Sequence, residues 1–383
     1  MIKMFCAHTK EIDDADVAVN DILSQIKADK NILRNSIGII SCCSEFAQTG
    51  VLKAICKTLP FTTVGTITLA SGINAGNGQL VLSVSVITAD DSFFVPLLSD
   101  KIDDKQENIV KFCQDSKKNI PENSKMILTF IPVNPNSSMT SETILNLIDD
   151  AEADIPIFGG AASSLDVKES AEVIFNGDVY NDRFVFVAVS GEINPKFVLS
   201  EIFPQKTVQE RWIVTETHGN LIAKINGIDF RKFVENLGGS HSLLEKNSFD
   251  IVPFWFDFSG INKPVARTIS MVTENGLGVC SGNVPIGVSV FIGNISKKMI
   301  VETTKTVSKE IYRHKEINGV LFFSGKERFF ALGANYNNEM YMLEELLEKI
   351  PFHVVYSQGG YCSDFSKNKE GRFLNYSLLG FVF

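Results

Sequence analysis

The sequence predicts an α/β protein of mixed α+β type, with two closely packed domains whose mixed or antiparallel sheets are flanked by helices. Two observations lead to this prediction. Roughly the first 200 residues alternate between segments with apolar residues at helical spacing and short apolar strands. From about residue 205 onward, short strands are separated by Gly-containing turns. We expect a helix-containing lead-in over 1–29, a first domain over 30–215 and a second over 216–383, packed closely because no low-complexity linker separates them.

Helical spacing and buried apolar runs define the elements of the first part. Pro60 ends one helix, and Ser and Thr residues suited to an N-cap begin the helix over 137–153. The expected elements are helix 14–33, strand 36–44, helix 50–59, strands 61–69 and 78–90, helix 106–118, strand 126–133, helix 137–153, strand 154–163 and a hairpin over 172–191.

In the second part, glycine turns and alternating apolar residues favour strands more often than helices. The expected elements are short strands over 203–229, helix 230–238, a loop with a short helix over 238–250, strands within 251–258, 265–285 and 287–294, helix 296–314, a strand and turn over 319–333, helix 337–350, a strand entering a glycine loop over 351–365 and a terminal strand over 373–383.

Composition excludes several classes of function. The 383 residues carry a net charge of −9, so a nucleic-acid partner is not expected. The first residues lack the apolar core of a signal peptide, and no run is long enough for a membrane span, so we expect a cytoplasmic protein without membrane insertion. Seven scattered cysteines without a C-x-x-C pair indicate reduced thiols. No metal-ligand spacing and no cofactor motif is found, so neither a metal nor a cofactor is expected.

The stretch IPIFGGAASSLD, residues 155–166, is the first candidate site. An apolar strand leads into two glycines, small residues and hydroxyls, which lets a ligand or another backbone approach closely. It has neither the P-loop pattern nor G-x-G-x-x-G nor a nucleophile elbow, which argues against phosphate binding and serine catalysis. LPFTTVGTITLASG and IPFHVVYSQGGYCSD share its layout, and three such loops could converge at one sheet edge, where ligands bind in α/β folds.

Two arginines interrupt apolar strands of the second part. Buried arginine beside a strand can bind a carboxylate through its planar fork, or can pair with an acid of the same chain. We favour the internal pair for Arg267 and the ligand role for Arg328.

These motifs, in this order, resemble those of the FIST domain family, a sensory and signal-transduction domain, from about residue 30 to the C-terminus. The matching positions of the N-terminal FIST part are Gly65, Thr68, Gly72, Gly159, Gly160, Ala162, Phe175, Asn176, Gly177, Thr215, Gly219, Asn220, Ile222, Asn226 and Gly227. Those of the C-terminal FIST part are Arg267, Arg328, Gly359, Asn375 and Ser377. The chain departs from the family pattern at Thr66 and Gly325, where the family has cysteine, at Gly360, where it has glutamate, and at Leu374, where it has histidine.

The resemblance implies a non-enzymatic sensor that binds a small ligand, an amino acid or related carboxylate, and relays occupancy to a separate signalling protein of kinase, cyclase or chemotaxis type. We expect a cleft in which Arg328 meets the carboxylate and the Gly159–Gly160 and Gly359–Gly360 loops offer backbone N–H groups. Further hydrogen bonds are expected from Ser163, Ser164 and Asn375.

The sequence leaves two other functions open. The chain could be an interaction scaffold with a vestigial pocket, which would form a stable complex and show no ligand-dependent change in stability. It could also be an enzyme of unknown reaction that uses Cys43 or a loop serine, which a reactivity probe would reveal.

Overall fold

Three stretches of the chain repeat one order of elements: strand, helix, strand, helix, strand, two short strands and a final strand. The computed structural model describes residues 1–383 except 28–30, 75, 104, 136, 138, 153, 167, 205–209, 239–252, 259–262, 336 and 364–370. Unit 1 consists of β1 (Ile2–Thr9), α1 (Ala15–Ile26), β2 (Asn35–Cys42), α3 (Ser44–Gln48), α4 (Val51–Thr58), β3 (Thr63–Ile67), β4 (Ser71–Ile73), β5 (Gly76–Gly78) and β6 (Leu82–Ala89). Unit 2 consists of β7 (Ser92–Leu98), α5 (Gln106–Ser116), η1 (Lys117–Asn119), β8 (Ser124–Ile131), α6 (Ser141–Ala151), β9 (Ile157–Ala161), β10 (Val173–Phe175), β11 (Asp178–Tyr180) and β12 (Val185–Gly191).

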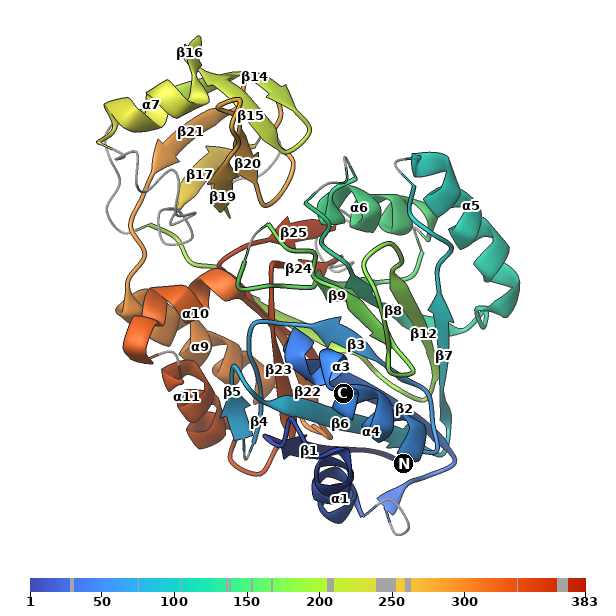
Figure 1. Cartoon of the computed structure of the whole chain (residues 1–383). Coiled ribbons are helices and arrows are strands. Elements are labelled where there is room, and N and C mark those ends of the chain that lie inside the picture. The colour runs from blue at the N-terminus through green and yellow to red at the C-terminus, as the bar shows by residue number, and fades with distance from the viewer. Residues whose placement is uncertain are drawn as a thin grey trace.

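The third unit contains an insertion after its first strand. Unit 3 consists of β13 (Lys196–Ser200), α9 (Lys297–Ile311), β22 (Val320–Gly325), α10 (Lys326–Leu332), η3 (Gly333–Asn335), α11 (Asn338–Leu347), β23 (Phe352–Ser357), β24 (Gly359–Cys362), β25 (Arg372–Leu374) and β26 (Leu378–Val382). The β-insert, residues 212–292, consists of β14 (Trp212–His218), β15 (Leu221–Ile225), β16 (Ile228–Asp229), α7 (Phe230–Asn236), β17 (Phe254–Asp257), β18 (Val265–Arg267), β19 (Ile269–Val272), β20 (Gly278–Cys280) and β21 (Ser289–Ile292). Figure 1 shows the β-insert standing apart from the body formed by the three units.

Each unit builds one six-stranded sheet with the same strand arrangement. The orders are β1-β6-β2-β3-β10-β11 in sheet 1, β7-β12-β8-β9-β24-β25 in sheet 2 and β13-β26-β22-β23-β4-β5 in sheet 3. In each sheet the second and third strands of the unit pair in parallel, as β2–β3, β8–β9 and β22–β23. The prediction of a mixed α/β class with mixed or antiparallel sheets is confirmed.

The short strand pairs are exchanged cyclically among the units. The pair β4–β5 of unit 1 joins β23 of unit 3, the pair β10–β11 of unit 2 joins β3 of unit 1, and the pair β24–β25 of unit 3 joins β9 of unit 2. Sheets 2 and 3 therefore contain strands from both the N-terminal and the C-terminal parts of the chain. The exchange explains the close packing expected from the lack of a linker.

The inner faces of the three sheets enclose a common core. Ile39 of sheet 1, Phe130 of sheet 2 and Phe323 of sheet 3 are fully buried in it, and the last two rings lie 5.8 Å apart. Helices cover the outer faces, with α1 and α4 on sheet 1, α5 and α6 on sheet 2, and α9 and α11 on sheet 3. The β-insert has a core of its own beneath α7.

Several sequence expectations need correction. Residues 2–9 and 92–98 form strands that the sequence did not predict. The expected turn after β22 is helix α10, because strong helix formers follow Gly325 and the helix ends only at Gly333, which has a positive φ. The loop and short helix predicted over 238–250 lie, except for Gly238, outside the described residues.

The predicted division into 1–29, 30–215 and 216–383 stays a prediction. Residues 1–29 contribute β1 and α1 to unit 1, and β1 pairs with β6 along its whole length. The boundary between residues 215 and 216 lies inside β14. The change near residue 205 to short strands separated by glycine turns thus marks the β-insert, which begins at Trp212. It does not mark an end of the repeated units.

Candidate functional site

The three segments with a shared layout meet at one place, the carboxyl-end face, which we define as the side of the body where β3, β9 and β23 end. Thr68 Oγ1 and Ser163 Oγ each donate a hydrogen bond of 2.5 Å to the backbone oxygen of Tyr356. The backbone N–H of Leu69 donates to Ser163 Oγ at 3.3 Å. The predicted convergence is found, but at the junction of three sheets instead of the edge of one.

The two glycine pairs lie in paired strands, whereas the sequence predicted loops. Strand β24 pairs antiparallel with β9, so that Gly360 is opposite Gly160. A Cβ at Gly160 would lie 2.5 Å from the ring of Phe323, and one at Gly360 would lie 2.7 Å from Leu379. The side chains of unit 3 therefore occupy the space that the missing Cβ atoms leave, and ligand contact at Gly159–Gly160 and Gly359–Gly360 stays a prediction.

The two Asn-Gly pairs of the family-like pattern form turns. Asn176 and Gly177 have φ of 53° and 82° between β10 and β11, and Asn226 and Gly227 have φ of 50° and 74° between β15 and β16. Both residues of such a turn need positive φ, which Asn and Gly adopt most easily. These signature residues are thus explained by the backbone and not by a ligand.

The predicted polar residues differ in exposure. Ser163 is buried in the contacts described above, while Ser164 is partly exposed and its Oγ accepts from the backbone N–H of Asp166 at 3.2 Å. Asn375 is buried and accepts from Ser281 Oγ at 2.6 Å while it donates to the backbone oxygen of Gln358 at 2.6 Å. Asn375 therefore links the β-insert to the body at the carboxyl-end face.

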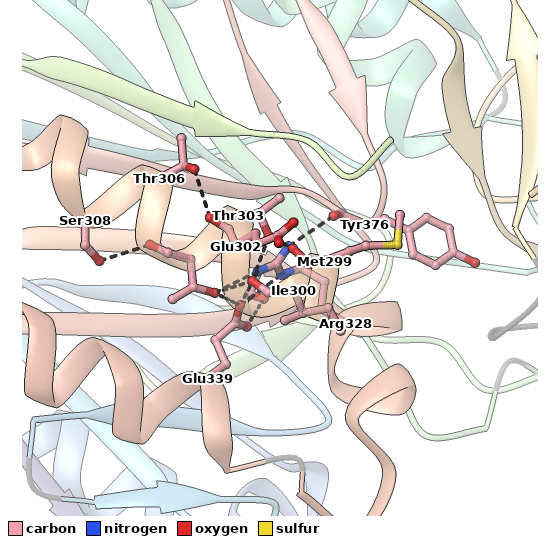
Figure 2. A network of polar contacts seen from close by, with 11 residues as sticks. Met299, Ile300, Glu302, Thr303, Thr306, Ser308, Arg328, Glu339 and Tyr376 are labelled. Atoms are coloured by element: carbon pink, nitrogen blue, oxygen red, sulfur yellow. Dashed lines mark hydrogen bonds and ion pairs between the residues drawn. The ribbon is translucent and has the colours of Figure 1, made fainter. Parts of the chain in front are cut away.

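Arg328 lies fully buried at the start of α10, where Figure 2 shows it at the centre of a polar network. Its Nε donates to Glu339 at 3.0 Å, and Nη2 forms an ion pair with the same carboxylate. Nη1 donates to Thr303 Oγ1 at 2.9 Å and to the backbone oxygen of Tyr376 at 3.4 Å, and Nη2 donates to Thr304 Oγ1 at 3.1 Å. All five N–H donors have acceptors in the chain, so the ligand role of Arg328 stays a prediction that requires displacement of Glu339.

A second polar network, which the sequence did not predict as a site, joins the β-insert to the body beside Asn375. Arg267 Nη2 pairs with Glu142 Oε1 of α6 at 2.8 Å, which is the internal pair favoured for this arginine. Thr268 Oγ1 donates to Glu327 of α10 at 2.8 Å. Asn283 donates through Nδ2 to Thr143 Oγ1 of α6 at 3.0 Å. Partners so far apart in the chain leave no signal in a single sequence.

Two groups that could act as nucleophile or base are not suited to it. Burial, and next the hydrogen bond with Glu45, raise the pKa of the Cys43 thiol to about 12, so the thiolate is scarce at neutral pH. His353 is fully buried, with Nε2 2.6 Å from Ser41 Oγ and Nδ1 2.9 Å from Ser85 Oγ. Burial lowers its pKa to about 3. Within the described residues, no group of three or more His, Cys, Asp or Glu could hold a metal ion.

The sequence and the fold were compared with those of known proteins. In the described part of the chain, no helix is both long and apolar enough to cross a membrane. No curated protein matches the sequence. Among solved structures, a cyanuric acid hydrolase described as "evolutionary innovation by structural concatenation" aligns with 77% of this chain and 99% of its own, at 9% identity and a TM-score of 0.29.

Half of the chain matches the model of a known protein family. The model of the FIST N domain matches residues 36–228, which is half of the chain and covers β2 to β16. The resemblance to the C-terminal FIST part stays a prediction. The chain belongs to the FIST N domain family, and its role is therefore that of a sensory and signal-transduction protein that binds a small ligand.

Proposed function

We propose that this protein senses a small carboxylate, an amino acid or a related molecule, at the carboxyl-end face beneath the β-insert, and relays occupancy to a separate signalling protein. Membership of the FIST N domain family supports the sensory role. In α/β folds, ligands bind beyond the carboxyl ends of parallel strands, which here meet in the centre of the body.

One observation carries the location: buried polar side chains of the body and the β-insert meet around Asn375. Burial of amide, hydroxyl and charged groups costs free energy, so their concentration at one junction calls for a reason beyond packing. Asn375 has one hydrogen bond to Ser281 of the β-insert and one to the backbone of Gln358, which directly precedes β24. A ligand beside Asn375 would contact both bodies at once.

The separate core of the β-insert supports the proposed relay. A unit that has its own core can shift as a body when contacts at its base change. A ligand held between the β-insert and the carboxyl-end face would alter those contacts, and the surface presented to a partner would change with them. The partner is a separate protein in this proposal, of kinase, cyclase or chemotaxis type.

Thermal unfolding against a panel of amino acids and small carboxylates tests the proposal. A ligand at 100 times its Kd should stabilise the chain by about 2.7 kcal/mol. The shift should be lost in Asn375→Ala and kept in Lys53→Ala, which removes an exposed ion pair with Asp178. A hit that Asn375→Ala binds as tightly as the native chain would place the ligand elsewhere.

One observation favours a second candidate, an interaction scaffold with a vestigial pocket. Gly360 and Leu374, which stand at the glutamate and histidine positions of the family pattern, are direct cross-strand neighbours of β24 and β25. This chain therefore lacks both the glutamate and the histidine side chain at two positions that face each other across the strands. A flat ligand panel, together with a stable complex captured from cell extract by the native chain, would favour the scaffold.

A further inference from the structure

The carboxylate of Glu142 is held by groups of the β-insert in the way that a bound carboxylate ligand would be. Glu142 lies in the first turn of α6, in the body. Its Oε1 accepts from Arg267 Nη2 at 2.8 Å, and its Oε2 accepts from the backbone N–H of Asn283 at 2.6 Å. One guanidinium and one backbone N–H, one on each oxygen, form a charge-assisted grip on a planar anion.

The β-insert is shaped around this anion. A Cβ at Gly282 would lie 2.5 Å from Glu142 Oε2 and 2.9 Å from Arg267 Cζ, so only glycine leaves room for the carboxylate. Arg267 Nη1 donates to the backbone oxygen of Phe373 at 2.6 Å, and the guanidinium lies 5.6 Å from the Phe258 ring centre and 5.8 Å from that of Phe373. These contacts fix the guanidinium plane.

The two sides of the contact differ in how firmly they are enclosed. The Arg267 side chain is 4% exposed and that of Glu142 is 13% exposed. Arg267 Nε is buried and has no hydrogen-bond partner among the described residues. The arginine therefore keeps one donor unused, while the glutamate sits at the more accessible side.

We propose that Arg267, the backbone N–H of Asn283 and the Cα of Gly282 form a carboxylate-binding cradle on the β-insert, and that Glu142 is its internal ligand. A small carboxylate, the ligand class of the proposed function, competes with Glu142 for this cradle. The exchange replaces one negative charge by another beside Arg267, so the guanidinium is never left buried without a counter-charge. This inference rests on the proposed function and names the groups that recognise its ligand.

Displacement of Glu142 also releases the β-insert from α6. Asn283 binds Glu142 through its backbone, Thr143 through Nδ2 and Thr140 through Oδ1 at 3.2 Å. These contacts all join one loop of the β-insert to the first turn of one helix. Competition at the cradle therefore converts occupancy into a looser junction, which is the change a partner would read.

Rescue of Glu142→Ala by acetate tests the cradle, because acetate replaces the CH₂–COO⁻ group that the substitution removes. Sodium acetate should raise the Tm of Glu142→Ala, with an apparent Kd at least tenfold lower than for the native chain, compared at each concentration with sodium chloride of equal ionic strength. Glu107→Ala, which removes an exposed glutamate from the first turn of α5, is the matched control and should respond as the native chain does.

The double variant Glu142→Ala/Arg267→Gln should lose the rescue, and it leaves neither charge of the pair unmatched. The inference would be overturned if Glu142→Ala folds and acetate stabilises it no more than it stabilises Glu107→Ala. If Glu142→Ala does not fold, Glu142→Gln keeps the side-chain shape, and amide hydrogen exchange over residues 265–283 should be faster in it than in Glu107→Gln. Equal exchange in the two variants would overturn the inference as well.

The two proposals can fail separately. Acetate rescue of Glu142→Ala with a flat ligand panel on the native chain would support the cradle and remove the sensor. A panel ligand that binds the native chain and Glu142→Ala equally, without acetate rescue, would support the sensor and remove the cradle.

Discussion

Acid should destabilise this protein through one buried histidine. His353 of β23 lies between Ser41 of β2 and Ser85 of β6, so that its ring joins sheet 3 to sheet 1. Burial lowers its pKa from 6.5 to about 3. Between these values the unfolded chain binds a proton at this side chain and the folded chain does not, so stability is fully present above pH 6.5 and falls as the pH drops toward 3.

The size of the effect follows from the two pKa values. Each pH unit well inside this range costs about 1.4 kcal/mol, so the step from pH 7.0 to 4.5 should remove about 2.6 kcal/mol from the free energy of unfolding. Burial raises the pKa of several carboxyl groups, among them those of Asp149, Glu172 and Glu201. In the acid range these groups take up protons more readily in the folded chain, so they stabilise it as the pH falls and oppose the effect of His353. The histidine contribution must therefore be isolated by a difference between variants.

Urea unfolding of the native chain and of His353→Gln at pH 7.0 and 4.5 provides that difference. Glutamine keeps hydrogen-bonding capacity toward one serine but does not titrate. The loss of stability between the two pH values should be about 2.6 kcal/mol larger for the native chain. His218→Gln, at an exposed position of β14, is the control for loss of a surface histidine. Equal pH dependence in the native chain and His353→Gln would refute the reasoning.

The buried Arg328–Glu339 pair and the strand exchange between units should both contribute to stability. Arg328→Ala should lower the free energy of unfolding by about 3–5 kcal/mol, because the Glu339 carboxylate then stays buried without its counter-charge, while Arg328→Ala/Glu339→Gln should recover part of that loss in the same urea titration. A fragment that ends at residue 228, the limit of the FIST N match, should aggregate or unfold in gel filtration and circular dichroism, since β9 loses β24 and β4 loses β23. A folded monomeric fragment would show that the strand exchange is not needed for stability.

The sequence predicted most helices and strands because periodicity is a local property. It also showed three segments of one layout, which are β3, β9 and β23 with the residues that follow them. What it could not show is which strands pair after each of these segments, because the choice between pairing within a unit and pairing with another unit depends on the closure of all three sheets. Gly160 illustrates this: its missing side chain is explained by Phe323, far along the chain.

The sequence predicted only part of the site, because a local pattern does not show which distant residues meet. Asn375 could be named because it stands in a family-like motif, and the structure places it at the junction with the β-insert. Glu142 could not be named, since an acidic residue in the first turn of a helix is fully explained by the helix dipole. The sequence favoured an internal pair for Arg267 and a ligand role for Arg328, and the structure gives each arginine a glutamate partner, on α6 and α11 respectively.

The two arginine–glutamate pairs differ in a way that bears on signalling. Arg328 and Glu339 both belong to unit 3 and are both fully buried, so their pair holds one unit together and cannot report on the position of the β-insert. Arg267 and Glu142 belong to the β-insert and to unit 2, and their pair breaks if those two bodies separate. The cyclic exchange of strands makes the three units one interlocked body, whereas hydrogen bonds and one ion pair join the β-insert to α6. A change of occupancy at the Arg267 pair therefore acts on the polar contacts to α6. Trp255, Ala266 and Phe291 of the β-insert share a buried apolar cluster with Ile300, Leu332 and Tyr376 of unit 3. The polar side of the junction can then open while this apolar side keeps the β-insert attached to the body.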